Sequence, residues 1–123
     1  MSLQAKELQI GDVVTLSIDL LKESCHPCVS RLSIRNIAAI DNGQLVACPI
    51  PLTEEILKAN GWELSLSCEF YTHKSGRNLK LSNLLGVPSI SFFGKISILH
   101  YVHELQHALR LCGLNDLADN FKV

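Results

Sequence analysis

Residues 100–113 read HYVHELQHALRLCG and carry the clearest helical pattern in the chain. Gly113 directly follows the pattern and is well suited to end a helix. Earlier segments alternate between apolar and polar residues, so the change of period marks the main helix of the protein. The apolar residues that define this helix recur at steps of four and three: Ile98, Val102, Leu105, Leu109 and Cys112.

The same stretch contains the zinc-peptidase string His-Glu-x-x-His, formed by His103, Glu104 and His107. The two histidines lie one helical turn apart and can bind Zn²⁺, while Glu104 would activate a metal-bound water as general base. A catalytic zinc also needs a third protein ligand, and the position of the third histidine in the extended motif is Gly113. A third ligand would have to come from elsewhere in the chain, from Asp116, His73 or His26.

Helical geometry favours a simpler interpretation of these histidines. At about 100° per residue, His100, His103 and His107 fall nearly opposite the apolar positions. The side opposite the core of a small domain faces water, so we expect a row of solvated imidazoles without a catalytic role. A zinc-dependent hydrolase that uses His103, His107 and Glu104 is the alternative.

The first third of the chain predicts mainly strands. Alternating apolar residues from Leu8 to Leu20 indicate a half-buried strand that is interrupted near Gly11-Asp12. Residues 32–40 predict further strand, and Asn42-Gly43 favours a tight hairpin because both residues tolerate positive φ. We expect this strand-rich N-terminal part to curl into a small SH3-like barrel.

The following residues predict a short middle helix and a β-hairpin. Thr53 supplies an N-cap oxygen for the helix, and Gly61 can end it. Residues 62–71 show the cleanest alternation in the chain and predict one strand, which a turn at residues 74–77 connects to the next. A further short strand is expected around residues 90–93. With the C-terminal amphipathic helix, the chain predicts an α+β fold.

Length and composition limit the class of protein. The 123 residues suit one domain, so we expect residues 1–123 to form a single domain. The 11 basic and 12 acidic residues nearly balance, so no overall field attracts nucleic acid or anionic lipid. Neither a secretory signal nor a membrane-spanning segment is apparent, so we expect a cytoplasmic protein without membrane contact. Hydrophobic residues make up 47%, a surplus that a protein partner or a second copy can cover.

Five cysteines are present, and their odd number argues against a disulfide framework. Cys25-His26-Pro27-Cys28 has the spacing of a thioredoxin-type redox motif or of half a zinc knuckle. The flanking residues lack the strand and helix that the redox motif requires, and no second Cys-x-x-Cys completes a knuckle. We therefore interpret the segment as a loop.

A basic hairpin gives a further alternative. The residues between Phe70 and His103 include four basic and no acidic side chains. Lys74, Arg77 and Lys80 of the hairpin at residues 71–80 are therefore candidates for contact with nucleic acid. Hairpin tips are also commonly basic because charge keeps them soluble and protects their edges.

Two segments carry a resemblance to a known group of proteins. They are Pro49-Ile50-Pro51-Leu52-Thr53 running through Asn60-Gly61-Trp62, and His100-Tyr101-Val102-His103 running through Leu111-Cys112-Gly113. Together they resemble small uncharacterised proteins encoded in gut bacterial genomes and their prophages. The resemblance implies a compact β-rich N-terminal part followed by a helix, and implies no activity. The group often reads His-x-Leu-Gln-Asn in the last segment, so Glu104 and His107 depart from its pattern.

These observations favour a non-enzymatic α+β protein that binds another protein or itself, with a homodimer as one form and no cofactor. The alternatives are the zinc-dependent hydrolase and a nucleic-acid-binding module.

Overall fold

The computed structural model describes residues 3–17, 28–77, 79–84, 86–92 and 95–123. These residues form an α+β fold with two antiparallel sheets. The elements in chain order are η1 (Ala5–Glu7), β1 (Val13–Ser17), β2 (Cys28–Arg31), α1 (Ile34–Asp41), β3 (Val46–Cys48), α2 (Glu54–Ala59), β4 (Trp62–Leu64), β5 (Phe70–His73), β6 (Lys80–Leu84), β7 (Val87–Phe92), β8 (Lys95–Ile98), α3 (Val102–Leu111) and α4 (Asn115–Asp119).

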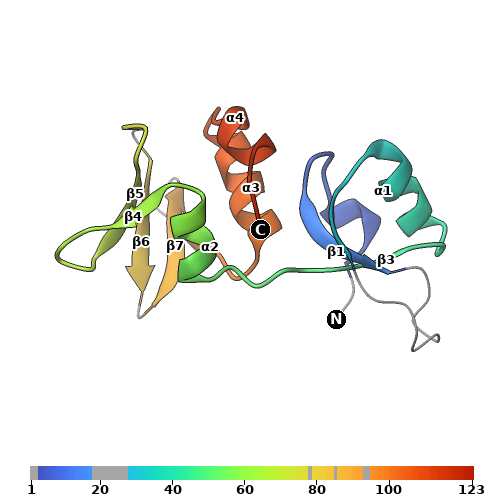
Figure 1. The fold of residues 1–123 in the computed structure, drawn as a ribbon, viewed down its shortest axis with the longest axis horizontal. Coiled ribbons are helices and arrows are strands. Elements are labelled where there is room, and N and C mark those ends of the chain that lie inside the picture. Colours follow the sequence, from blue (N-terminus) through green and yellow to red (C-terminus); the bar gives the residue numbers. More distant parts are fainter. Residues whose placement is uncertain (1–2, 18–27, 78, 85, 93–94) are drawn as a thin grey trace.

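Helix α3 lies between the two sheets. Figure 1 shows α3 and α4 in the middle, with the three-stranded sheet and α1 on one side and the larger sheet and α2 on the other. The strand order is β2-β1-β3 in the first sheet and β4-β5-β6-β7-β8 in the second. Residues 49–53 connect the two halves as an extended segment, which hydrogen-bonds to the start of α3 through Ile50 and Leu52. We call residues 3–17 and 28–48 the N-terminal unit.

The two halves have separate apolar cores. The alternation of β1 divides its side chains between them, because Val14 packs into the core of the N-terminal unit while Val13 packs toward α3. The larger core joins the second sheet to the apolar side of α3. Its main side chains are Leu57, Trp62, Tyr71, Leu81, Ile90, Leu105, Leu109 and Phe121.

One predicted strand is a helix. Residues 34–41 form α1, whereas the sequence suggested strand over residues 32–40. Ser33 explains the difference, because its hydroxyl accepts a hydrogen bond from the Asn36 N–H at 3.2 Å and the Asn36 side chain accepts from the Ser33 N–H at 2.9 Å. This reciprocal cap satisfies two N–H groups at the start of a helix.

The predicted strand over residues 62–71 is interrupted. It splits into β4 and β5, which pair with each other as an antiparallel hairpin. Cys68 adopts a left-handed conformation with φ of 59°, and the Ser65 hydroxyl accepts from the N–H groups of Glu69 and Phe70. Hydrogen bonds to the Ser65 side chain therefore stabilise a turn within a segment whose alternating pattern predicts a continuous strand.

Other local predictions are confirmed. Thr53 caps α2 by accepting from the Ile56 N–H, and the turn at residues 74–77 joins β5 to β6. Helix α3 is present but begins at Val102, because residues 95–98 form strand β8 instead. The described N-terminal strands form an open three-stranded sheet and not a closed SH3-like barrel. No helix in the described residues is long and apolar enough to span a bilayer.

Candidate functional site

The residues of the zinc-peptidase string lie on α3, so the site is built from this helix. Glu104, the general base of the alternative zinc-dependent hydrolase, caps the helix. One of its carboxylate oxygens, Oε1, accepts hydrogen bonds from the N–H groups of His100 at 3.0 Å and Tyr101 at 2.9 Å. A glutamate at the third helical position that bonds back to the residue before the helix is a standard N-terminal cap.

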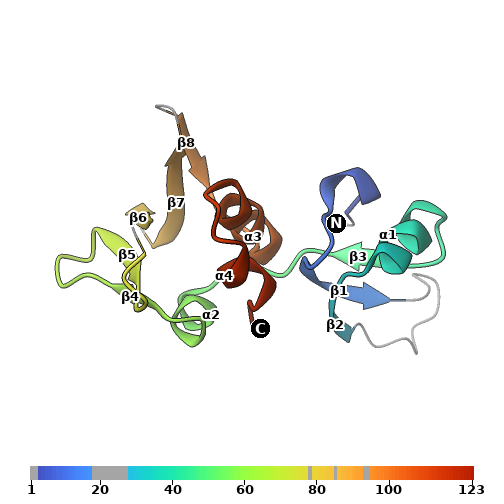
Figure 2. The ribbon, with the colours of Figure 1, turned by 90° about the horizontal axis from the view of Figure 1, so that it is seen from above.

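The expected orientation of the histidines is wrong for His103. Its side chain is buried, with only 6% of its surface exposed, and stacks on the Tyr101 ring at a centroid distance of 6.0 Å. His107 contacts the His103 ring edge to face and is also largely covered, with 25% of its side chain exposed. Figure 2 shows α3 between the N-terminal unit and the larger sheet. Gln106, His107 and Arg110 on the polar side of α3 bond to residues of the N-terminal unit, so both of these sides of the helix are packed.

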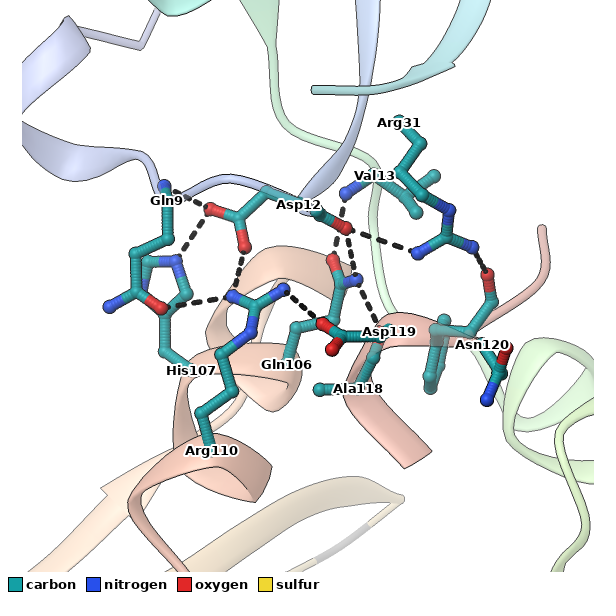
Figure 3. Close-up of polar contacts among 12 residues, drawn as sticks. Gln9, Asp12, Val13, Arg31, Gln106, His107, Arg110, Ala118, Asp119 and Asn120 are labelled. Carbon is teal, nitrogen blue, oxygen red and sulfur yellow. Dashed lines mark hydrogen bonds and ion pairs between the residues drawn. The ribbon is translucent and has the colours of Figure 1, made fainter. Parts of the chain in front are cut away.

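A buried aspartate organises the contact between α3 and the N-terminal unit. Asp12, directly before β1, has no exposed surface, and its carboxylate accepts a hydrogen bond from the Gln9 N–H at 2.8 Å. Figure 3 shows His107 and Arg110 approaching the same carboxylate. The His107 Nε2 atom and the Arg110 Nη1 atom each lie 2.6 Å from an Asp12 oxygen. We call this cluster, together with Gln106, the polar junction.

Gln106 completes the polar junction. It is fully buried, and its side-chain oxygen accepts from the Val13 N–H at 2.8 Å. Its side-chain nitrogen donates to the carbonyls of Gly11 and Ala118, both at 2.9 Å. One side chain on α3 thus joins the start of β1 to α4, and all its hydrogen-bonding groups are used.

The backbone of Gly11 lies close to the Arg110 side chain at the polar junction. Gly11 has φ of +92°, and a Cβ atom there would lie 3.0 Å from an Arg110 guanidinium nitrogen. Arg31 donates hydrogen bonds to the carbonyls of Gly11 and Phe121, and so connects β2 to the C-terminal residues. A side chain at position 11 would therefore strain the backbone and displace Arg110.

Burial lowers the pKa of His103. Desolvation of the charged imidazolium is the largest cause, and the nearby Asp12 carboxylate partly opposes it. The Nδ1 atom of His103 is buried and has no hydrogen-bond partner among the described residues. The structure therefore favours a neutral ring at this position.

The geometry of the polar junction does not suit zinc. The described residues contain no group of three or more His, Cys, Asp or Glu side chains that could hold a metal ion. His107 Nε2 faces Asp12, and the further ligands considered from the sequence lie elsewhere: His73 bonds to Ser75 and the Asn60 carbonyl, and Asp116 pairs with Arg77. His26 is outside the described residues.

An aspartate that holds an imidazole can orient it as a base. No serine, threonine or cysteine side chain among the described residues hydrogen-bonds to His107. Arg110 shares the Asp12 carboxylate, so the cluster has the composition of a structural ion-pair network. These contacts hold the N-terminal unit against α3.

A groove lies between α3 and β8, beside the polar junction, with which it shares His107. It has a volume of about 280 Å³, and its lining includes Ile98, Leu99, Glu104, His107, Ala108 and Leu111. Leu111 is 78% exposed and Ile98 is 46% exposed. The groove is therefore mainly apolar, with two polar side chains from the zinc-like string at one wall.

Each of the three basic hairpin residues has a contact within the chain. Arg77 pairs with Asp116 of α4, and the Lys80 ammonium lies over the Phe70 ring at 4.6 Å from its centroid. Lys74 contributes to a different, polar pocket beside Asn60 and Lys122. Asp116, the partner of Arg77, also lines the pocket that contains Lys74, so an acidic side chain lies beside two of the three basic residues.

The Cys25-His26-Pro27 part of the cysteine loop lies outside the described residues, and Cys28 begins β2. Cys48, Cys68 and Cys112 carry free thiols.

Sequence reasoning missed Asp12, Gln106 and Arg110 as partners. A charged residue next to the apolar Val13-Val14 pair hints at a buried ion pair, since such residues are rarely buried alone. The sequence does not identify His107 as a partner of Asp12, because the two residues are 95 positions apart.

No protein family, curated protein or solved structure matches this chain. The resemblance to small proteins of gut bacteria and their prophages therefore stays a prediction.

Proposed function

We propose that this protein binds another protein chain through the open edge of β8 and the groove beside it. The observation that carries the proposal is the exposure of β8 at the end of the larger sheet. All four of its residues are exposed, including Ile96 at 65% and Ile98 at 46%. Among the described strands, only β7 pairs with β8.

An open sheet edge is a binding surface because its N–H and carbonyl groups can pair with a further strand. Proteins usually protect such edges with charged side chains, proline or a covering segment. Strand β8 has one charged residue, Lys95, and carries two isoleucines on one face. Figure 2 shows the β7–β8 hairpin reaching out from the body of the protein, where an incoming chain can approach it.

The groove supplies what an edge strand lacks, namely sites for side chains. Backbone pairing gives affinity that depends little on sequence, whereas pockets select the residues of the partner. Leu111 and Ile98 expose apolar surface at this groove, which fits the apolar surplus of the composition. A partner strand with alternating apolar residues would cover it.

The two alternatives have less support. A zinc-dependent hydrolase needs a third ligand near His103 and His107, and no such cluster occurs in the part of the chain described. At a nucleic-acid interface through Lys74, Arg77 and Lys80, the phosphates would compete with Asp116 for Arg77. A cytoplasmic location, expected from the sequence, belongs to the same proposal and fits the free thiols of Cys48, Cys68 and Cys112.

Site-specific photocrosslinking tests the proposal. A benzophenone side chain placed at Ile96 is expected to give one discrete adduct in cells, with the new bond mapped to an extended segment of the bound chain. Ile34 is the matched control, because it is also an exposed isoleucine, at 70%, but lies on α1. The same background products from both positions would overturn the proposal.

A further inference from the structure

The partner at the β8 edge follows from the sequence and backbone of the strand itself. We infer that β8 pairs with β8 of a second copy of this chain, antiparallel and centred on Ser97, so that the two five-stranded sheets form one continuous sheet. The inference rests on the proposed function, since it names the occupant of the same edge.

The backbone of β8 presents a self-complementary set of groups. The Leu99 N–H donates to the Pro88 carbonyl at 2.9 Å, on the β7 side. Because N–H directions alternate along a strand, the N–H and carbonyl groups of Ile96 and Ile98 point away from β7. In a pairing centred on Ser97, Ile96 faces Ile98 of the second copy. The outward N–H and carbonyl groups of Ile96 and Ile98 then form hydrogen bonds between the two copies, on both sides of the two-fold axis at Ser97.

The side chains match in the same register. Ile96 and Ile98 lie on one face of the strand, so two copies bring four isoleucines together across the new pair of strands. Their present exposure of 65% and 46% falls when this cluster forms. Ser97 meets Ser97 on the axis, where a small side chain allows close approach.

Charges are complementary as well. In this register Lys95 lies opposite Leu99 of the second copy, on the opposite strand face from the isoleucines. Leu99 and Glu104 line the same groove, and only one Glu104 oxygen is used in the helix cap. Lys95 has no ion pair within the described residues. Each copy therefore offers a lysine to the other copy's carboxylate, and no like charges face each other along the strand pair.

The oligomeric state of the full chain tests the inference. Light scattering after size exclusion, from about 5 to about 500 µM, is expected to show a mass that rises from 13.6 kDa toward twice that value. Ile96→Lys places a charge against an isoleucine and is expected to raise the dimer dissociation constant by about tenfold or more. The same change at the exposed Ile34 is the matched control. A mass of 13.6 kDa at every concentration would overturn the inference.

Two further variants test the register. Ser97→Cys is expected to form a disulfide between copies under mild oxidation, mapped by peptide mass spectrometry, whereas Ser82→Cys on β6 is not. Glu104→Gln keeps an acceptor for the helix cap and removes the charge that Lys95 would meet. It is expected to raise the dimer dissociation constant, whereas the thermal stability of the monomer falls only slightly, because the helix N-terminus loses a carboxylate but keeps an acceptor. A dimer that ignores all these changes would contradict β8 pairing.

The outcomes separate this inference from the proposed function. A monomer whose Ile96 photocrosslinks to a different protein overturns self-pairing and leaves the binding function standing. A monomer without any adduct specific to Ile96 overturns both.

Discussion

At the residue scale, the carboxylate of Asp12 is the central group of the polar junction. It is fully buried, and it receives Arg110, His107 and the Gln9 N–H. A buried charge is stable only when its partners compensate for the lost water, so these contacts depend on one another. Removing Asp12 would leave Arg110, whose side chain is only 16% exposed, without its nearest anion.

Asp12→Ala is therefore expected to lower the free energy of unfolding by about 3 kcal/mol, because the largely buried Arg110 keeps only the more distant and exposed Asp119 carboxylate, at 3.6 Å. Urea denaturation followed by circular dichroism measures the change. Asp41→Ala is the matched control, since Asp41 is exposed at the end of α1. Equal effects of the two substitutions would contradict a structural role for the buried carboxylate.

His103 gives the protein a predicted pH dependence. Burial lowers the pKa of its imidazole from 6.5, so the unfolded chain takes up a proton at a higher pH than the folded chain does. The unfolded state then binds more protons, and stability falls as the pH drops below about 6.5 toward the pKa of the folded state. Above that range the ring is neutral in both states and has no effect.

Substitution of His103 isolates this contribution. His103→Gln removes the titrating ring, so the loss of stability between about pH 6.5 and pH 5 is expected to be smaller than in the wild type. Thermal unfolding over a pH series provides the measurement, and His100→Gln, at an exposed position, is the matched control. An unchanged pH profile in His103→Gln would show that the buried ring does not contribute.

At the element scale, capping decides where α1 and α3 begin. Each helix starts with a side chain three positions inside it that bonds back to the residue ahead, Asn36 to Ser33 and Glu104 to Tyr101. In α3, the cap is a structural role for Glu104, the glutamate of the zinc-like string. For α1 it turns an apolar segment that resembles a strand into a helix.

Ser33→Ala is expected to lower the free energy of unfolding by about 1 kcal/mol, the usual cost of losing an N-cap hydroxyl. Guanidinium denaturation of the variant and the wild type measures the difference. Ser91→Ala in β7 is the control, because Ser91 is exposed and caps no helix. If both substitutions have the same small effect, the Ser33 cap does not hold α1 in solution.

At the scale of the whole molecule, α3 contacts both halves of the protein. Its apolar side packs into the larger core, while its polar side is joined to the N-terminal unit by the polar junction. The N-terminal core is a separate cluster built from six buried residues: Leu3, Leu8, Val14, Leu32, Ile40 and Ala47. Hydrogen bonds and ion pairs thus provide much of the coupling between the two halves.

Gln106→Leu tests this coupling. It keeps a similar volume but leaves the buried Val13 N–H without its partner, at a cost of about 3 kcal/mol. The carbonyls of Gly11 and Ala118 each lose one hydrogen bond and keep those from Arg31 and the Phe121 N–H. We expect amides of β1 and β3 to exchange hydrogen faster than those of α3 in this variant. Native-state hydrogen exchange by mass spectrometry measures this difference.

The control for this prediction is Gln44→Leu, the same substitution at an exposed glutamine. It is expected to leave the exchange pattern of both halves unchanged. An equal acceleration of exchange in β1, β3 and α3 of Gln106→Leu would mean that the two halves unfold as one unit.

The sequence by itself determined the local parts of the structure. The α+β class, the α2 cap at Thr53, the turn at residues 74–77 and the end of α3 just before Gly113 were all readable. These features depend on capping groups, turn residues and periodicity within a few positions of one another. Where two periods fit equally well, as in residues 32–40, the sequence could not separate strand from helix.

Only the tertiary structure decided what covers the polar side of α3. Periodicity shows that His103, Gln106 and His107 share a side of the helix, but a polar side packs against protein as readily as against water when the partner supplies the matching groups. Asp12 and the backbone of Gly11 and Val13 supply them from the far end of the chain. Because burial of a charge depends on a partner distant in sequence, no local pattern could reveal it.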